Sequence, residues 1–186
     1  DVALTKIGSV GKPLARTEVK LLNAYGEEVA LGEVGEICVR GPQVMKGYLR
    51  NPEETSNTIR NGWLHSGDLG RFDDEGYLYI VDRKKDMIIR GGENIYPIEI
   101  EEVLYQMPEI LEAAVVGIPH KVYGEVPKAL VVLKADQALT DADIINYTQT
   151  QLAKYKVPAE VEFIASLPRN ASGKVLKHTL RPVQNV

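Results

Sequence analysis

Lys174 follows a glycine in a stretch of small and polar residues late in the chain. An ammonium group on a flexible four-carbon stem can be swung into a cleft from such a stretch. A mobile positive charge suits a reaction that brings two anions together, because it stabilises charge where the transition state gathers it. We therefore predict that Lys174 is a catalytic cation on a flexible strand-to-helix connection, although an isolated Ser-Gly-Lys is more typical of an exposed surface lysine.

Two further charged residues have the chemistry of a nucleotide site. Asp68 follows a glycine in a predicted loop, where a carboxylate accepting two hydrogen bonds could bind the vicinal hydroxyls of a ribose. Arg83 follows a predicted strand, and its fixed fork of donors could reach a nucleotide. The alternatives stay open at this point, because a Gly-Asp pair is common in turns and Arg83 could simply pair with Asp82 or Asp86.

The histidines and the cysteine do not form a catalytic or metal-binding pattern by spacing. His65, His120 and His178 are far apart in the sequence, and His65 is near enough to Asp68 to line the same predicted loop. The single cysteine, Cys38, excludes paired zinc ligands of the Cys-x-x-Cys type and is predicted to be a buried thiol. We predict no metal ligands and no covalent nucleophile in this chain.

The composition excludes several classes of protein. The chain has 186 residues, 44% of them hydrophobic, and a net charge of −4, so it should fold and gives no reason to expect a nucleic-acid partner. The short basic run at 83–85 is flanked by acids. No apolar run approaches the roughly 20 residues of a membrane-spanning helix. We expect a cytoplasmic protein with no transmembrane segment, and peripheral membrane contact stays open.

The elements that must position these residues fall into two regions. The first is β-rich, with strands predicted at 17–22, 35–40 and 77–81 and one short helix at 52–59 that begins after the N-cap candidate Asn51. Asp73 to Gly76 is predicted as a turn before the third strand. We place a domain boundary at 82–85, where strand and helix signals begin to alternate.

The second region is predicted to be a compact α/β domain. Its expected elements are a strand at 87–90, a turn at Gly91-Gly92, a helix from Pro97, paired strands at 112–118 and 126–134, a helix from about Thr140 to Lys154, a strand at 161–165 and a short helix at 173–181. The predicted fold class is therefore α/β (α+β), with a partial, barrel-like β-rich subdomain before the α/β domain.

Three ordered segments resemble the closing half of an adenylate-forming acyl-CoA synthetase. Residues 62–70 read GWLHSGDLG, residues 82–94 read DRKKDMIIRGGEN, and residues 168–174 read PRNASGK. The resemblance runs from about Ile7 to the end of the chain. It implies that residues 1–82 are part of the large adenylation domain and that residues 83–186 are the small mobile domain.

The resemblance also implies roles for individual residues. Lys174 would bridge the attacking carboxylate and the α-phosphate of ATP, while Asp68 would bind the ribose and Arg83 would lie at the nucleotide. Lys85 matches the hinge position, about which the small domain rotates between two working orientations.

Gly91 and Gly92 match the turn that lies beside the pantetheine channel when the thioester forms. A glycine pair lets the backbone approach a ligand that a β-carbon would block. The simpler interpretation, a hairpin turn that requires positive φ, is compatible with this role.

The implied reaction joins a carboxylic acid, expected to be a fatty acid, to coenzyme A with ATP consumed and AMP formed. Mg²⁺ would assist, and its ligands are expected upstream of this chain, in a missing N-terminal part of the same polypeptide that also carries the acyl pocket. We expect the isolated chain to be inactive. Alternatives are an adenylation domain that loads a carrier-protein thiol, a luciferase-like relative, against which Ile89 argues mildly, and a noncatalytic binding module.

Overall fold

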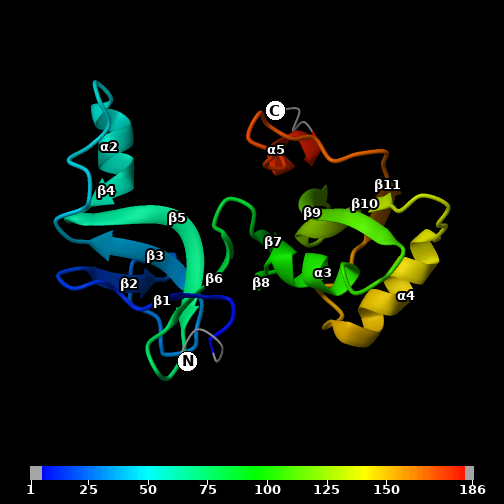
Figure 1. Ribbon diagram of the computed structural model, residues 1–186, viewed down its shortest axis with the longest axis horizontal. Coiled ribbons are helices and arrows are strands. Elements are labelled where there is room, and N and C mark those ends of the chain that lie inside the picture. The colour runs from blue at the N-terminus through cyan, green and yellow to red at the C-terminus, as the bar shows by residue number, and fades with distance from the viewer. Residues whose placement is uncertain (1–5, 183–186) are drawn as a thin grey trace. The chain divides into compact units, whose positions relative to one another are not determined.

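The computed structural model describes residues 6–182 (Figure 1). The chain divides into two compact units between Lys85 and Asp86. This division lies three residues beyond the end of the first domain expected from the sequence, at residue 82. The reason is local, because the Arg83 and Lys84 side chains pair with Asp68 and Glu36 of the first unit.

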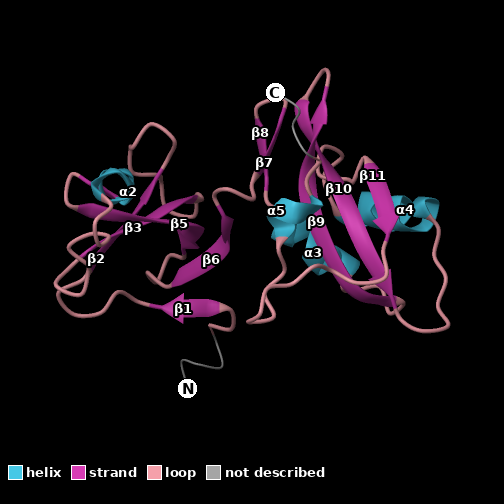
Figure 2. Cartoon of the chain, turned by 90° about the horizontal axis from the view of Figure 1, so that it is seen from above, coloured by secondary structure: helices cyan, strands magenta, loops and turns pink. Residues whose placement is uncertain are grey.

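The first unit is built on an antiparallel sheet (Figure 2). Its strands are β1 (Ser9–Gly11), β2 (Glu18–Leu22), β3 (Gly35–Arg40), β4 (Ile59–Arg60), β5 (Trp63–Phe72) and β6 (Leu78–Arg83). The hydrogen-bonded order is β1-β6-β5-β3-β2, with β4 on β5. Within residues 6–182 the two edge strands, β1 and β2, do not pair, so the sheet is open and the partial, barrel-like subdomain expected from the sequence does not close into a barrel.

Apolar packing in the first unit is centred on β3. Ile37 packs with Leu21 and Leu78 in a small cluster, because alternate residues of neighbouring strands point to the same face. Helix α2 (Pro52–Thr58) begins where Asn51 Oδ1 accepts a hydrogen bond from the backbone of Glu54, and none of its residues is buried. The predicted helix at 52–59 is confirmed, and it decorates the sheet.

The segment around Asp68 differs from the prediction. We expected a loop, but Asp68 lies inside β5, the longest strand of the first unit. The error has a clear origin, since Ser66, Gly67 and Gly70 interrupt the apolar alternation that identifies a strand. The prediction of a strand at 77–81 is close to the observed β6, which continues through Arg83.

The second unit is a sheet with helices on both faces. Its strands are β7 (Ile88–Arg90), β8 (Glu93–Ile95), β9 (Ile110–His120), β10 (Gly124–Leu133) and β11 (Glu160–Phe163), and its helices are α3 (Pro97–Leu104), α4 (Asp141–Gln151) and α5 (Lys177–Leu180). Strand β10 is central, antiparallel to β7 and β9 and parallel to β11.

Alternation along β9 and β10 produces two apolar layers. Val115 and Val131 face the layer that contains residues of α3 and α4, whereas Val116 and Leu130 face the layer that contains Leu167. Figure 1 shows α5 across these strands from α3 and α4. A sheet covered on both faces explains why these strands read as continuous apolar runs in the sequence.

Two helices of this unit are shorter than predicted. Helix α4 opens with a capping box of Thr140 and Asp143 but ends at Gln151 rather than near Lys154. Its buried residues are Ile144 and Thr148. The last helix begins at Lys177 instead of 173, so Lys174 lies in a turn before it. No helix among residues 6–182 is long and apolar enough to cross a membrane.

Candidate functional site

Asp68 is presented by a bulge in β5. Strand β3 pairs Glu36 with Leu69 and Cys38 with His65, so β5 uses four residue steps where β3 uses two. Gly67 lies in this extra segment with φ +74°, a left-handed conformation that favours glycine. The bulge interrupts the ladder between β3 and β5 next to Asp68, as bulges near functional sites often do.

Asp68 and Arg83 form an ion pair across β5 and β6. Arg83 Nε lies 2.9 Å from Asp68 Oδ1, and the two residues are directly opposite in the strand register. The Lys84 backbone donates to the Gly67 carbonyl at 2.9 Å, and the Asp68 backbone donates to Ser66 Oγ at 3.1 Å. The side chains of Asp68 and Arg83 are partly exposed, so a carboxylate and a guanidinium lie together within reach of a ligand.

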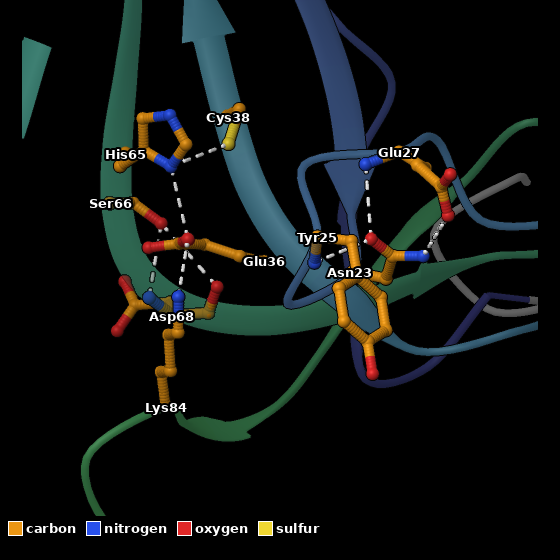
Figure 3. Close-up of polar contacts among 9 residues, drawn as sticks. All are labelled: Asn23, Tyr25, Glu27, Glu36, Cys38, His65, Ser66, Asp68 and Lys84. Carbon is orange, nitrogen blue, oxygen red and sulfur yellow. Dashed lines mark hydrogen bonds and ion pairs between the residues drawn. The ribbon is translucent and has the colours of Figure 1, made fainter. Parts of the chain in front are cut away.

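Beside this pair lies a polar cluster that the sequence did not predict (Figure 3). The buried Glu36 carboxylate accepts hydrogen bonds at Oε2 from His65 Nδ1 at 3.0 Å and from Lys84 Nζ at 2.9 Å. Cys38 Sγ lies 3.3 Å from the same His65 nitrogen. His65 therefore points to Glu36 and Cys38. Part of this cluster could have been predicted from the sequence, because Glu36 and Cys38 are two residues apart on a predicted strand and therefore point to the same face of the sheet.

Burial and charge act in opposite directions on Glu36. Burial raises the pKa of the carboxyl, but hydrogen bonds from His65 and Lys84 and the charge of Lys84 outweigh it and hold the pKa below its usual value. Burial, with the Glu36 charge, raises the pKa of the Cys38 thiol to about 11. At neutral pH the carboxylate is thus ionised and can only accept, so His65 carries a hydrogen on Nδ1.

These protonation states bear on metal binding. Glu36, Cys38 and His65 each offer one ligand atom, and these atoms lie within 4.8 Å of one another. A metal would require the Cys38 thiol to ionise and His65 Nδ1 to lose its hydrogen. Lys84 already supplies a positive charge to the carboxylate. The arrangement is thus satisfied as a hydrogen-bonded network.

Lys174 lies in a hydrogen-bonded turn between β11 and α5, where we predicted a flexible connection. Asn170 Oδ1 accepts hydrogen bonds from the backbones of Ser172 and Lys174 and from the Ser172 hydroxyl. Arg169 donates to the Gly173 carbonyl at 2.6 Å and pairs with Glu112 of β9. The backbone of the turn is therefore fixed to the sheet of the second unit, while the Lys174 residue is exposed.

Gly91 and Gly92 form the two-residue turn between β7 and β8. Their φ values are +59° and +93°, and Arg90 pairs with Glu93 across them. Two positive φ values are those of a type I′ hairpin, which confirms the interpretation as a turn. The Gly91 backbone donates to the Tyr123 carbonyl at 2.8 Å, so the turn rests on the end of the β9–β10 hairpin.

The structure brings some of the predicted residues together within each unit. Asp68 and Arg83 are paired in the first unit, and Lys85, exposed in a turn, is its last residue. Lys174, Gly91 and Gly92 belong to the second unit. The chain thus carries a potential nucleotide-binding pair in one unit and a potential catalytic cation in the other.

Comparison with known families identifies both units. The family model of the AMP-binding enzyme matches residues 1–49, and that of the AMP-binding enzyme C-terminal domain matches residues 99–174. A 2-succinylbenzoate–CoA ligase from Bacillus cytotoxicus is 50% identical over 181 residues, which are 97% of this chain and 37% of that protein. The chain thus spans little more than a third of the length of this relative.

Solved structures agree with these matches. The o-succinylbenzoate CoA synthetase (MenE) of Bacillus subtilis, in complex with the acyl-adenylate intermediate OSB-AMP, is similar with a TM-score of 0.88 and 43% identity, covering 98% of this chain and 37% of that one. ATP-bound MatB from Rhodopseudomonas palustris is similar with a TM-score of 0.88 and 41% identity, covering 94% of this chain and 35% of that one.

Proposed function

Because the chain belongs to the family of AMP-binding, adenylate-forming enzymes, we propose that it is part of a ligase that joins a carboxylic acid to coenzyme A. The observation that carries the proposal is the ion pair of Asp68 and Arg83, held on neighbouring strands beside a bulge. The names of the similar CoA ligases support the class of reaction. The part of the polypeptide that completes the active site lies outside this chain.

The proposed reaction has two steps at one site. A carboxylate oxygen attacks the α-phosphorus of ATP, pyrophosphate leaves, and an acyl-adenylate forms. The thiol of coenzyme A then attacks the acyl carbon, and AMP leaves. Mg²⁺ would balance the charge of the phosphates, and we assign its ligands to residues outside this chain, because the buried carboxylate of the polar cluster is already paired with Lys84.

Asp68 and Arg83 are proposed to bind the nucleotide. A carboxylate has about four lone-pair sites, so the hydrogen bond from Arg83 leaves acceptors for the two ribose hydroxyls. Arg83 would hold the carboxylate in place and direct its remaining donors towards the nucleotide. The hydrogen bonds of the bulge fix the backbone that carries this pair.

Lys174 is proposed to act in the first step. Its ammonium would lie between the attacking carboxylate and the α-phosphate and stabilise the charge that both bring into the transition state. The turn formed around Asn170 supports this role, because it fixes the backbone and leaves the side chain exposed to reach a ligand.

The second step is proposed to use another face of the second unit. Rotation about Lys85, the last residue of the first unit, would withdraw Lys174 and bring the turn of Gly91 and Gly92 beside the thiol-bearing arm of coenzyme A. Gly92 supports this assignment. Nothing lies within 4 Å of the position that a β-carbon would occupy there, so this side of the turn exposes backbone that a ligand can approach.

Two kinds of carboxylic acid are candidates for the substrate. The resemblance favours a fatty acid, whereas the similar ligases named above act on 2-succinylbenzoate. We propose a carboxylic acid of one of these two kinds. Relatives that load carrier proteins share the first step, so the acceptor must be tested separately from the acid.

The decisive test is acid-dependent exchange of pyrophosphate into ATP by the complete polypeptide that contains this chain. Acids from acetate to palmitate and 2-succinylbenzoate are compared.

Lys174→Ala should slow exchange by about 100-fold, typical of losing a donor to transition-state charge, while sparing thioester formation from supplied acyl-adenylate. Lys154→Ala, which removes another exposed lysine of the second unit, is the matched control. Absence of exchange with every acid would refute the proposal, and equal loss in both half-reactions would remove Lys174 from the first step.

The noncatalytic alternative is tested with the 186-residue chain itself. Because the nucleotide pair here lacks the rest of the enzyme, we expect AMP to bind more weakly than about 1 mM, which corresponds to roughly −4 kcal/mol. Micromolar affinity for AMP, measured by calorimetry, would favour a self-sufficient nucleotide-binding module.

A further inference from the structure

Glu36 is the only charged residue that is buried among residues 6–182. Its side chain is 7% exposed, and it lies near the start of β3 between two buried neighbours, Gly35 and Ile37. A buried carboxylate is costly unless it is fully paired, and an apolar residue in the same position is often as stable or more so. Stability alone therefore does not account for a glutamate here, and its partners indicate what else it does.

The two partners of Glu36 flank the proposed nucleotide pair. His65 is the residue at which β5 leaves its regular pairing with β3, three residues before Asp68. Lys84 follows Arg83 directly, and its backbone donates to the Gly67 carbonyl. A single oxygen of Glu36 thus fixes the start of the bulge that bears Asp68 and the end of the strand that bears Arg83 (Figure 3).

The link acts where the backbone pairing of β5 is only partly regular. The ladder between β5 and β6 pairs Asp68 with Arg83 but shifts register between Leu69 and Gly70, and β6 ends at Arg83. The ladder between β3 and β5 is interrupted over the same residues. The side-chain bonds of Glu36 therefore supplement the pairing of Asp68 with Arg83 on the side of β5 where the ladder to β3 is interrupted.

We infer that Glu36 is a positioning residue for nucleotide binding: through His65 and Lys84 it holds Asp68 and Arg83 in the arrangement that accepts a ribose. The inference rests on the proposed function. It predicts a specific kinetic signature, because a displaced ribose-binding pair weakens ATP binding but leaves the reacting groups intact. A residue needed only for folding would instead lower the amount of active enzyme and leave the KM of the remainder unchanged.

The main test uses Glu36→Gln in the complete polypeptide. Glutamine preserves the size of the side chain and its acceptor oxygen but removes the charge that balances Lys84. We expect the KM for ATP in pyrophosphate exchange to rise about tenfold, with kcat changed by less than about twofold. Lys84→Met should raise the KM for ATP to a similar extent, whereas Lys84→Arg, which keeps the positive charge, should leave it close to that of the unsubstituted enzyme. The double variant Glu36→Gln/Lys84→Met should have a KM no higher than that of either single variant.

Cys38→Ala is the matched control, because it alters a buried residue of the same strand and the same cluster. We expect its KM for ATP to be unchanged. If instead Cys38→Ala reproduces the defect and the purified enzyme holds one equivalent of metal that a chelator removes with loss of activity, the cluster is a metal site and the inference is overturned. An unchanged KM in folded Glu36→Gln and Lys84→Met overturns it as well.

A second measurement does not depend on catalysis. In the 186-residue chain, Glu36→Gln should increase hydrogen exchange at the Asp68 and Lys84 amides about tenfold and leave the amides of β9 and β10 unchanged. Unchanged exchange at both amides would refute the positional link even if the complete polypeptide had no ligase activity. If the unsubstituted enzyme does not exchange pyrophosphate into ATP but Glu36→Gln still changes hydrogen exchange at the two amides, only the proposed function is contradicted. Lys84, whose side chain is 44% exposed, provides a variant that should fold if Glu36→Gln does not.

Discussion

The two units are held together by different forces. The second unit buries two apolar layers, one on each face of its sheet, in which Ile88, Leu104 and Val131 are fully or almost fully inaccessible. The first unit has one small apolar cluster and a buried carboxylate. Its surface leaves Ile7, Leu14, Leu31 and Leu49 each at least 69% exposed.

The two kinds of interaction have different consequences for a binding site. Apolar burial stabilises a unit without fixing particular polar atoms, because the hydrophobic effect has no direction. Hydrogen bonds and ion pairs contribute less net stability but specify geometry. The first unit, which carries Asp68 and Arg83, uses Glu36 in this second way. The second unit fixes the turn of Lys174 by polar contacts and rests that turn on an apolar layer.

The largest expected effect is on stability in the second unit. Leu104→Ala removes a fully buried side chain of α3 and should lower the free energy of unfolding of this unit by about 3–4 kcal/mol. Urea unfolding is followed by circular dichroism, which is sensitive to helices α3 and α4 of this unit, and by fluorescence of Trp63, the one tryptophan, which lies in the first unit.

The matched change is Leu78→Ala in the first unit, which should cost about 2 kcal/mol because its smaller cluster can relax. Each substitution should move only the transition of its own unit. Coincident shifts of both signals would show that the units unfold together, and the comparison would then fail.

The next effect is a pH dependence confined to the first unit. The pKa of Cys38 is raised from 9.0 to about 11 in the folded state. As pH rises above 9, the unfolded chain ionises its thiol first, so the folded state loses stability between pH 9 and pH 11, by up to about 2 kcal/mol. Cys38→Ala should abolish this part of the alkaline decline in the Trp63 transition. Identical declines with and without the thiol would contradict the burial of Cys38.

A smaller effect is expected at the junction of the units. On the proposed mechanism, Lys85→Pro in the complete polypeptide should spare adenylation and slow thioester formation about tenfold, equivalent to about 1.4 kcal/mol, because proline fixes the φ angle on which rotation depends. Lys85→Ala, which removes the charge and keeps the rotation, is the control. The two half-reactions are measured separately by single turnover. Full thioester activity in Lys85→Pro would remove Lys85 from the hinge.

The smallest effect compares two helix caps. Thr140→Ala removes the side-chain cap of α4, whose Ile144 and Thr148 are buried, and should destabilise the second unit by about 1 kcal/mol. Asn51→Ala removes the cap of α2, which buries no residue, so the Trp63 transition should hardly move. A large shift from Asn51→Ala would mean that α2 supports the sheet more than its burial indicates.

Much of the fold could be predicted from the sequence because its signals are local. The capping box at Thr140, proline at the start of α3 and the paired apolar runs of β9 and β10 each follow from short-range patterns, and the structure contains all of them. The glycine pair at 91–92 indicated a turn for the same reason. The recognition of the family also came from short segments that keep their order.

The rest depended on contacts between distant residues. The strand that contains Asp68 was mistaken for a loop, because its bulge hides the apolar alternation. The link from Glu36 to Lys84 joins residues 48 positions apart, and no local pattern marks it. The ordered turn before Lys174 depends partly on the pairing of Arg169 with Glu112, which is equally remote in sequence.

The turn around Asn170 has a consequence for the cost of each catalytic cycle. Ordering a loop of several residues costs about 1–2 kcal/mol of conformational entropy per residue. Here one amide oxygen gathers three hydrogen bonds, so this ordering is complete once the chain has folded. With Lys174 in its proposed role, each turnover has to fix the orientation of the second unit and the torsions of one side chain, but not the backbone of the turn.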